Sequence, residues 1–125
     1  MKDLIIVGSG GLGRETAWTA ERINSVSPEW NILGFIDDNI QVQGQYIDGY
    51  KVIGTTAAVG KYPDAYFVCA VGNAKIRRRI VEKMKSIADV KFATLIDPAA
   101  VFGRERVQVG EGCIICANTY ITLDI

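Results

Sequence analysis

The chain has 125 residues, of which 49% are hydrophobic and 22% are charged, a composition typical of an ordinary globular domain. Its 14 basic residues balance its 14 acidic ones, so it lacks the basic excess expected of a protein that binds nucleic-acid phosphates. It has no histidine, which excludes imidazole as a catalytic base or metal ligand within these residues.

Neither the N-terminus nor the cysteine content indicates export or membrane insertion. The apolar run at residues 4–7 is too short for a signal peptide, and no segment approaches the roughly 18 apolar residues of a membrane span. The three cysteines make no disulfide framework. Cys113 and Cys116 have the spacing of half a metal site, but no second pair completes it. We therefore expect a cytoplasmic protein with no membrane span and no bound metal.

Strand and helix patterns alternate through the first 96 residues. Aliphatic runs predict buried strands, glycines and prolines mark the turns, and apolar residues at helical spacing predict amphipathic helices. The predicted strands cover residues 4–7, 31–36, 65–71 and 92–96, and the main helices cover residues 14–23 and 74–87. This alternation is typical of parallel β/α units with right-handed crossovers, so we expect a small Rossmann-like parallel sheet with flanking helices.

The pattern changes after residue 97. Val109, Ile115 and Ile121 recur every six residues, each two places after another member of the repeat. A hexapeptide repeat of this kind predicts a β-helix with one strand per repeat. Three repeats make about one coil, which cannot bury its own ends, so we expect a fragment of a longer protein. The predicted domains are residues 1–97 and the start of a second domain at residues 98–125.

A glycine-rich loop follows the first predicted strand. Gly8, Gly10 and Gly13 have the G-x-G-x-x-G spacing, Gly11 adds a fourth glycine, and a helix follows. Glycines at such a turn let backbone N–H groups approach a phosphate at the positive end of the helix. The alternative is a turn that only packs the helix against the strand.

Polar residues follow the second and third predicted strands. Asp37 and Asp38 end one strand, and Gly72 and Asn73 end another. Parallel strands share a carboxyl edge, where open α/β sheets bind ligands, so these residues are candidates for substrate binding. The acidic pair is equally compatible with a solvated turn or a cap. Asn73 is also a candidate helix N-cap, and its two roles can coexist.

Several short motifs together carry a resemblance that covers the whole chain. They are residues 6–15 (IVGSGGLGRE), 34–38 (GFIDD), 52–54 (VIG), 70–73 (AVGN) with Arg77, 96–101 (IDPAAV) and 109–112 (VGEG). In this order the motifs resemble the sugar O-/N-acyltransferase family that includes the sialic acid O-acetyltransferases and the bacillosamine-pathway acetyltransferases.

The resemblance implies that the N-terminal domain binds a nucleotide-activated sugar, commonly a UDP-sugar. The phosphate or sugar would contact Gly10, Gly11 and Gly13. The uracil would contact Asp37 or Asp38, and the opposite side of the binding site would be closed by Gly72 and Asn73. It also implies a left-handed β-helix that forms a homotrimer, binds acetyl-CoA between subunits and carries a catalytic histidine beyond residue 125. This chain alone would therefore be inactive.

Two departures and two alternatives accompany this resemblance. Leu12 stands where the family often has histidine or an aromatic residue, and Asp97 stands where many members have histidine, a position we interpret as structural. An NAD(P)-binding domain of an oxidoreductase would use the same glycine spacing, with Asp37 on the ribose. A non-enzymatic nucleotide sensor or oligomerisation module is the third hypothesis.

Overall fold

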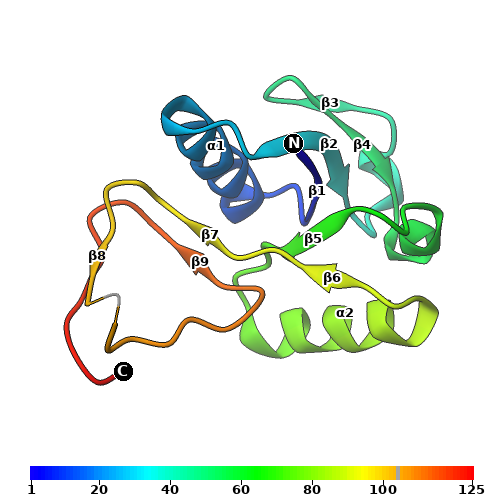
Figure 1. Ribbon diagram of the computed structural model, residues 1–125. Helices are drawn as coiled ribbons and strands as arrows, with labels where there is room; N and C mark the ends of the chain where they lie inside the picture. Colours follow the sequence, from blue (N-terminus) through cyan, green and yellow to red (C-terminus); the bar gives the residue numbers. More distant parts are fainter. Residues whose placement is uncertain (104) are drawn as a thin grey trace.

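The computed structural model describes residues 1–103 and 105–125, which form a six-stranded sheet between helices and a set of short strands beside it (Figure 1). The elements are β1 (Lys2–Val7), α1 (Gly11–Val26), β2 (Trp30–Ile36), η1 (Ile40–Val42), β3 (Tyr46–Ile47), β4 (Tyr50–Gly54), η2 (Thr56–Lys61), β5 (Tyr66–Cys69), α2 (Ala74–Ile87), β6 (Lys91–Phe92), β7 (Leu95–Ile96), β8 (Val101–Phe102), β9 (Ile114–Ile115) and β10 (Tyr120–Ile121). Within the described residues, no helix is both long and apolar enough to cross a bilayer.

The strand order of the main sheet is β3-β4-β2-β1-β5-β6. All neighbouring pairs are parallel except β3 and β4, which form an antiparallel hairpin at one edge. The chain leaves β1 for β2 on one side and later returns to β5 on the other side. The order therefore reverses between β1 and β5, which is where open α/β sheets bind ligands. The expected α/β architecture with a parallel sheet and flanking helices is confirmed.

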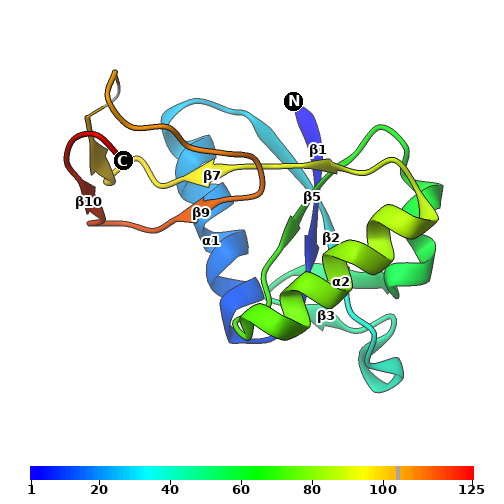
Figure 2. The ribbon, with the colours of Figure 1, turned by 90° about the horizontal axis from the view of Figure 1, so that it is seen from below.

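Successive side chains of β1 point to opposite faces of the sheet, and both faces are buried. Leu4 and Ile6 pack in the cluster that includes α1, whereas Ile5 and Val7 pack in the cluster that includes Met84 of α2. Figure 2 shows α1 and α2 on the two sides of the strands. A strand covered on both faces needs apolar residues at every position, which explains the uninterrupted aliphatic run.

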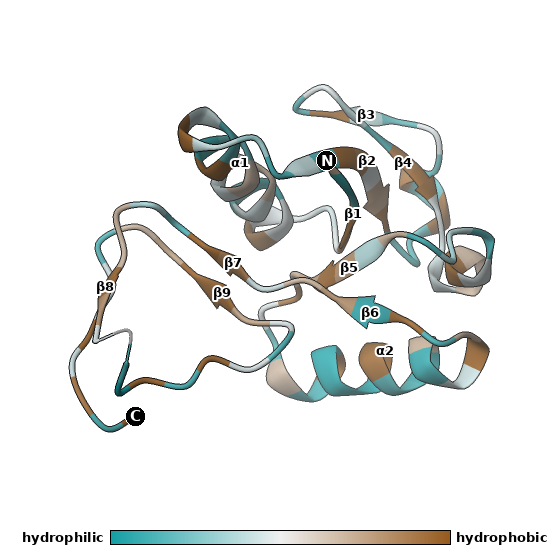
Figure 3. Ribbon diagram, viewed as in Figure 1, coloured by the Kyte–Doolittle hydropathy of each residue, from teal (hydrophilic) through white to brown (hydrophobic). Residues whose placement is uncertain are grey.

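The helix α2 matches its predicted bounds, whereas its apolar face is narrower than predicted. Met84 is fully buried and Ile80 is packed against the core, but Ile76 and Ile87 are 47% and 42% exposed. Figure 3 shows hydrophilic and hydrophobic residues alternating along this helix. Ile76 and Ile87 lie in the first and last turns of α2, where helical periodicity does not lead to burial.

Two local features differ from the sequence prediction. The predicted strand at residues 92–96 is two short strands, because β6 pairs with β5 of the main sheet and β7 pairs with β9. The β3–β4 hairpin was not predicted, although its signal is present. Asp48 and Gly49 have φ angles of 51° and 86°, and an Asp-Gly pair favours such a two-residue turn.

Residues 95–103 and 105–125 lie beside the main sheet and next to α1 (Figures 1 and 2). Their strands pair in parallel, β7 with β9 and β8 with β10, and the partners in each pair are 19 residues apart. The Gln108 amide donates to the Ile125 carbonyl at 2.8 Å, which adds a third contact between successive passes of the chain. In this part of the chain, segments 17 to 19 residues apart therefore lie side by side, as successive turns of a coil do.

Candidate functional site

The predicted site residues come together at the carboxyl edge of the main sheet. Val7 at the end of β1 is in register with Ile36 of β2 and with Cys69 of β5. The Gly8 amide donates to the Ile36 carbonyl at 2.7 Å, so the glycine loop starts directly beside the acidic pair. The loops after β1, β2 and β5 therefore lie at one edge of the sheet, as predicted.

The four glycines of the loop have two different surroundings. A Cβ atom on Gly8, whose φ is +104°, would lie 2.7 Å from the Ala70 carbonyl oxygen, and one on Gly13 would lie 1.9 Å from the Gly8 carbonyl oxygen. A Cβ atom on Gly10 or Gly11 would meet nothing within 4 Å. Gly8 and Gly13 are therefore needed for packing inside the protein, whereas Gly10 and Gly11 leave open space at the surface.

The N-terminus of α1 presents free backbone donors at this open space. Gly10 is the N-cap and, among the described residues, no side chain caps the helix. The first helical amide with an internal partner is that of Arg14, which donates to the Gly10 carbonyl at 3.0 Å. Uncapped amides together with the helix dipole favour an anion at this position.

The Asp37 carboxylate holds the glycine loop against the end of β2. Its Oδ2 accepts hydrogen bonds from the Ser9 amide at 3.1 Å and the Ser9 hydroxyl at 2.6 Å, and its Oδ1 accepts from the Asn39 amide at 2.9 Å. Partial burial raises the pKa of the Asp37 carboxyl, but these hydrogen bonds outweigh burial and leave the pKa below its usual value. The carboxylate is therefore ionised and positioned at the site.

The Asp38 carboxylate points to different partners. Its Oδ1 accepts from the Thr56 amide and the Thr56 hydroxyl, both at 2.8 Å, at the start of η2. Lys83 of α2 lies 3.7 Å from its Oδ2. Asp38 therefore joins β2 to η2 and α2. The sequence shows no spacing that would have identified Thr56 or Lys83 as partners.

The loop after β5 contains the second candidate pair. Asn73 is the N-cap of α2, and its Oδ1 accepts hydrogen bonds from the amides of Lys75 and Ile76 at 3.0 Å each. The predicted capping role is confirmed. Gly72 is exposed, and a Cβ atom there would meet nothing within 4 Å.

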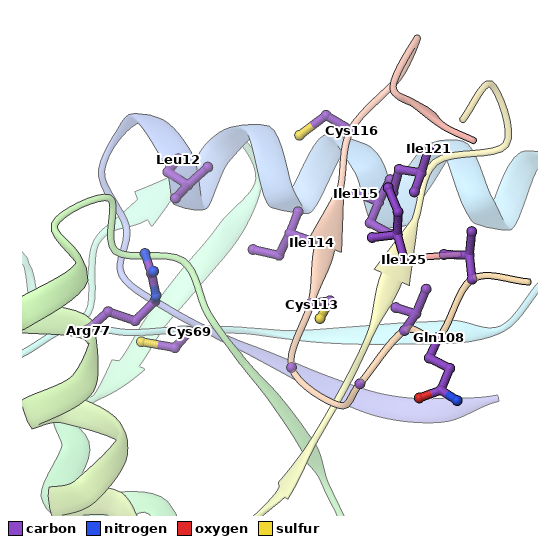
Figure 4. A pocket seen from close by; sticks show the side chains of 14 residues that line it. Leu12, Cys69, Arg77, Gln108, Cys113, Ile114, Ile115, Cys116, Ile121 and Ile125 are labelled. Carbon is purple, nitrogen blue, oxygen red and sulfur yellow. The ribbon is translucent and has the colours of Figure 1, made fainter. Parts of the chain in front are cut away.

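A cavity of about 560 Å³ lies between this edge of the sheet and the segment at residues 107–125 (Figure 4). On the sheet side it is lined by Leu12, Cys69 and Arg77, and on the other side by mostly apolar residues that include Cys113 and Cys116. Burial raises the pKa of the Cys69 thiol. Within the described residues, no group of three Cys, Asp or Glu side chains is placed to hold a metal ion.

Asp97 has the structural role expected of it. It is buried, and its carboxylate accepts two hydrogen bonds from Arg22 of α1, at 2.7 and 3.1 Å, and one from the Ala99 amide at 2.8 Å. The pair joins α1 to the turn between β7 and β8. Asp97 therefore positions residues 95–103 and lies outside the lining of the cavity.

Comparison with known proteins places this geometry in a family. The sequence profile of the PglD N-terminal domain matches residues 3–84. The chain is 32% identical over 121 residues to UDP-N-acetylbacillosamine N-acetyltransferase of Bacillus subtilis, and 29% identical over 120 residues to GDP-perosamine N-acetyltransferase of Escherichia coli O157:H7. Each match covers 94% of this chain and 52% of the relative, so the chain spans about half the length of these enzymes.

A solved structure agrees with the sequence matches. The acetyltransferase domain of PglB from Neisseria gonorrhoeae, in complex with acetyl coenzyme A, superposes with a TM-score of 0.74 at 28% identity. The match covers 98% of this chain and 60% of that one. The profile match extends over most of the main sheet and both of its helices, and the chain therefore belongs to the PglD N-terminal domain family.

Proposed function

We propose that this chain is the nucleotide-sugar-binding domain of an acetyl-CoA-dependent sugar N- or O-acetyltransferase. Membership of the PglD N-terminal domain family supports this proposal, and so do two related enzymes whose names specify a UDP-sugar and a GDP-sugar. A UDP-sugar is the preferred substrate class, because the relative with the higher identity of these two acts on one. The family does not favour the alternative of an NAD(P)-linked oxidoreductase.

The observation that carries the proposal is the open space at Gly10 and Gly11. These two glycines have room for a ligand beside the uncapped start of α1, while Gly8 and Gly13 are enclosed by protein. The site lies at the reversal of strand order, where a phosphate meets backbone donors and a helix dipole. In this proposal Gly10 and Gly11 face the diphosphate, and Gly8 and Gly13 shape the loop that presents them.

The base is proposed to lie on the β2 side of the loop, near Asp37 and Asp38. A carboxylate oxygen can accept two hydrogen bonds, and Asp37 Oδ1 and Asp38 Oδ2 each accept one, so both side chains retain acceptor capacity for a donor on the base. Gly72 and Asn73 are proposed to close the opposite side of the site. The exposed surface of Gly72 supports this placement.

The second part of the protein is proposed to be a left-handed β-helix built from hexapeptide repeats. The parallel pairs β7–β9 and β8–β10 support a coil that begins within this chain. The domain division at residues 1–97 and 98–125 stays a prediction, and the pairing of β7 with β9 favours a start of the coil at residue 95. We propose a homotrimer that binds acetyl-CoA at this second domain and uses a histidine outside these 125 residues. The PglB complex with acetyl coenzyme A supports the co-substrate. The cytoplasmic location stays a prediction.

The chemistry assigned to this chain is binding and orientation. Holding the diphosphate and the base fixes the sugar, so that its amine or hydroxyl is positioned for attack on a thioester. The attack forms the amide or ester bond, the carbon–sulfur bond of the thioester breaks, and the acceptor's proton leaves to a base. No residue of this chain is assigned to that proton transfer.

Nucleotide binding to this chain is the direct test. We expect UDP or a UDP-sugar, or the corresponding GDP compound, to raise the melting temperature in a thermal-shift experiment and to bind in calorimetry, while NAD has no effect. Stabilisation by NAD alone would reverse the assignment in favour of the oxidoreductase.

The variant Gly11→Ala locates the site within the same experiment. Its methyl group meets nothing in the free protein, so folding is retained, but it occupies the space assigned to the diphosphate. We expect nucleotide affinity to fall about tenfold or more, the effect of roughly 1.4 kcal/mol or more of overpacking. The matched control is Gly60→Ala in η2, which is equally open and lies away from the site. Equal affinity of the two variants would contradict the placement of the phosphate.

A further inference from the structure

Arg77 differs from the two arginines that follow it. Arg78 is exposed and pairs with Glu82 at 3.1 Å, and Arg79 is also exposed. Arg77 is half-buried and turns back toward the loop after β5. Its Nη1 donates to the Val71 carbonyl at 2.9 Å and lies 3.5 Å from the Gly72 carbonyl. The run of three arginines is thus divided between an exposed helix face and the edge of the site.

The charge of Arg77 has no acidic partner among the described residues. None of the ion pairs within residues 1–103 and 105–125 includes it. A guanidinium carries five N–H donors, and here only Nη1 has protein acceptors among these residues. The Nε and Nη2 donors therefore remain available to a ligand, and the carbonyl contacts already hold the side chain in place, which lowers the entropy lost on binding.

Arg77 also lies beside the glycine loop, because the loop after β5 to which it donates lies against Gly8. It lines the 560 Å³ cavity together with Leu12, the residue after Gly11, and it lines a second cavity of about 350 Å³ beside α2. Figure 4 shows the Arg77 side chain next to Cys69 and facing the side of the cavity where Leu12 lies. Burial raises the pKa of the Cys69 thiol, and the nearby positive charge of Arg77 partly offsets this rise. The guanidinium therefore lies close to Cys69, at the end of β5.

We propose that Arg77 binds the diphosphate of the nucleotide-sugar and at the same time holds the β5–α2 loop that closes the site. This inference rests on the proposed function and adds a cationic residue to it. The partial charge of about +0.5 at one helix N-terminus does not offset a diphosphate. A guanidinium supplies a full charge and a planar fork that matches phosphate oxygens. Coenzyme A also carries a diphosphate, so the test includes it as the competing source.

The test compares Arg77→Gln and Arg77→Lys with the control Arg78→Gln in calorimetry with UDP, GDP, uridine, guanosine and coenzyme A. Glutamine removes the charge while keeping a polar N–H donor, and lysine keeps the charge while removing the planar fork. We expect Arg77→Gln to weaken binding of the preferred nucleoside diphosphate about tenfold to a hundredfold, the usual effect of losing a charge-assisted hydrogen bond. Binding of the nucleoside and of coenzyme A is expected to remain unchanged. Arg77→Lys is expected to be intermediate, and Arg78→Gln to match the wild type.

The salt dependence of diphosphate affinity distinguishes an ionic contact between Arg77 and the ligand from a role of Arg77 in holding the β5–α2 loop. We expect wild-type affinity for the diphosphate to fall as ionic strength rises, and the affinity of Arg77→Gln to fall less steeply. Equal loss of nucleoside and nucleoside diphosphate binding, with unchanged salt dependence, would assign Arg77 only to the loop and overturn the inference. Unchanged diphosphate affinity would overturn it while leaving the proposed function intact, as would weakening confined to coenzyme A. If the wild type binds neither UDP nor GDP, both proposals fail.

Discussion

Gly11 and Gly13 lie two residues apart in the first turn of α1, but only the surroundings of Gly13 require glycine. The position of Gly13 is closed by the Gly8 carbonyl oxygen, 1.9 Å from where a Cβ atom would be, while the position of Gly11 is open. The spacing of the glycines could be read from the sequence, and so could the strand before them and the helix after them. Which glycines are enclosed depends on how α1 packs against the turn after β1, and spacing carries no such information.

Substitution at Gly13 is expected to destabilise the protein. The methyl group of Gly13→Ala collides with backbone, which cannot rotate away as a side chain can, so we expect the free energy of unfolding to fall by about 2–3 kcal/mol. Urea denaturation followed by circular dichroism measures this. Gly11→Ala is the matched control in the same turn of α1 and is expected to unfold like the wild type. A Gly13→Ala variant as stable as the control would show that the loop can shift.

For Asp37 and Asp38, too, the sequence predicts their location but not their individual partners. Two adjacent aspartates at the end of a strand predict a polar site, and the strand end is where they are found. The sequence does not separate their roles. Asp37 binds Ser9 of the glycine loop and Asp38 binds Thr56 of η2, and these partners are 28 and 18 residues away. Long-range partners of this kind depend on the packing of strands and loops.

At the scale of elements, local sequence signals were sufficient to predict the bounds of α2 but not to predict the two short strands within residues 91–96. The helix begins after an asparagine cap and continues through helical periodicity, so its bounds depend on neighbouring residues. The segment at residues 92–96 reads as one apolar strand. Its two halves pair with β5 and β9, and β9 lies about 20 residues further along the chain. Strand pairing between distant segments is determined by tertiary packing and cannot be read from the local sequence.

The cap of α2 can be tested separately from the proposed ligand contact. Asn73→Ala removes the acceptor for the Lys75 and Ile76 amides, so we expect a loss of about 1 kcal/mol in the free energy of unfolding. Asn73→Asp keeps an acceptor and suits the helix dipole, so it is expected to retain stability. Chemical denaturation of both variants measures the difference. Equal stability of the two would mean that the cap contributes little to folding.

At the scale of the whole molecule, Arg22 and Asp97 join the two parts of the chain. Arg22 lies on α1 and Asp97 follows β7, and 75 residues separate them in the sequence. The hydrogen bond from Arg22 lowers the pKa of the Asp97 carboxyl, with help from the Ala99 amide, and this exceeds the opposing effect of burial. Because the folded pKa is below the unfolded value, the ionised carboxylate favours folding at neutral pH.

This ion pair predicts a pH dependence of stability. The contribution of Asp97 is fully present above its unfolded pKa of about 3.9 and is lost as the pH falls through the lower pKa of the folded state. We therefore expect Asp97→Asn to be less stable than the wild type at neutral pH, with a difference that shrinks below about pH 4. Urea unfolding across this pH range measures the effect. Asp64→Asn, at an exposed position that forms none of the ion pairs among the described residues, is the control. A constant difference across the pH range would contradict the assignment.

The sequence by itself determined the alternation of strands and helices, the carboxyl edge where the candidate site lies, and the family to which the chain is similar. These follow from periodicity, turn residues and motif order, which are local properties of the chain. Only the tertiary structure decided which glycines face open space, which partner each aspartate holds, and that Arg77 turns away from its neighbours toward the site. The physical reason is that each depends on contacts or steric exclusion between residues brought together by packing.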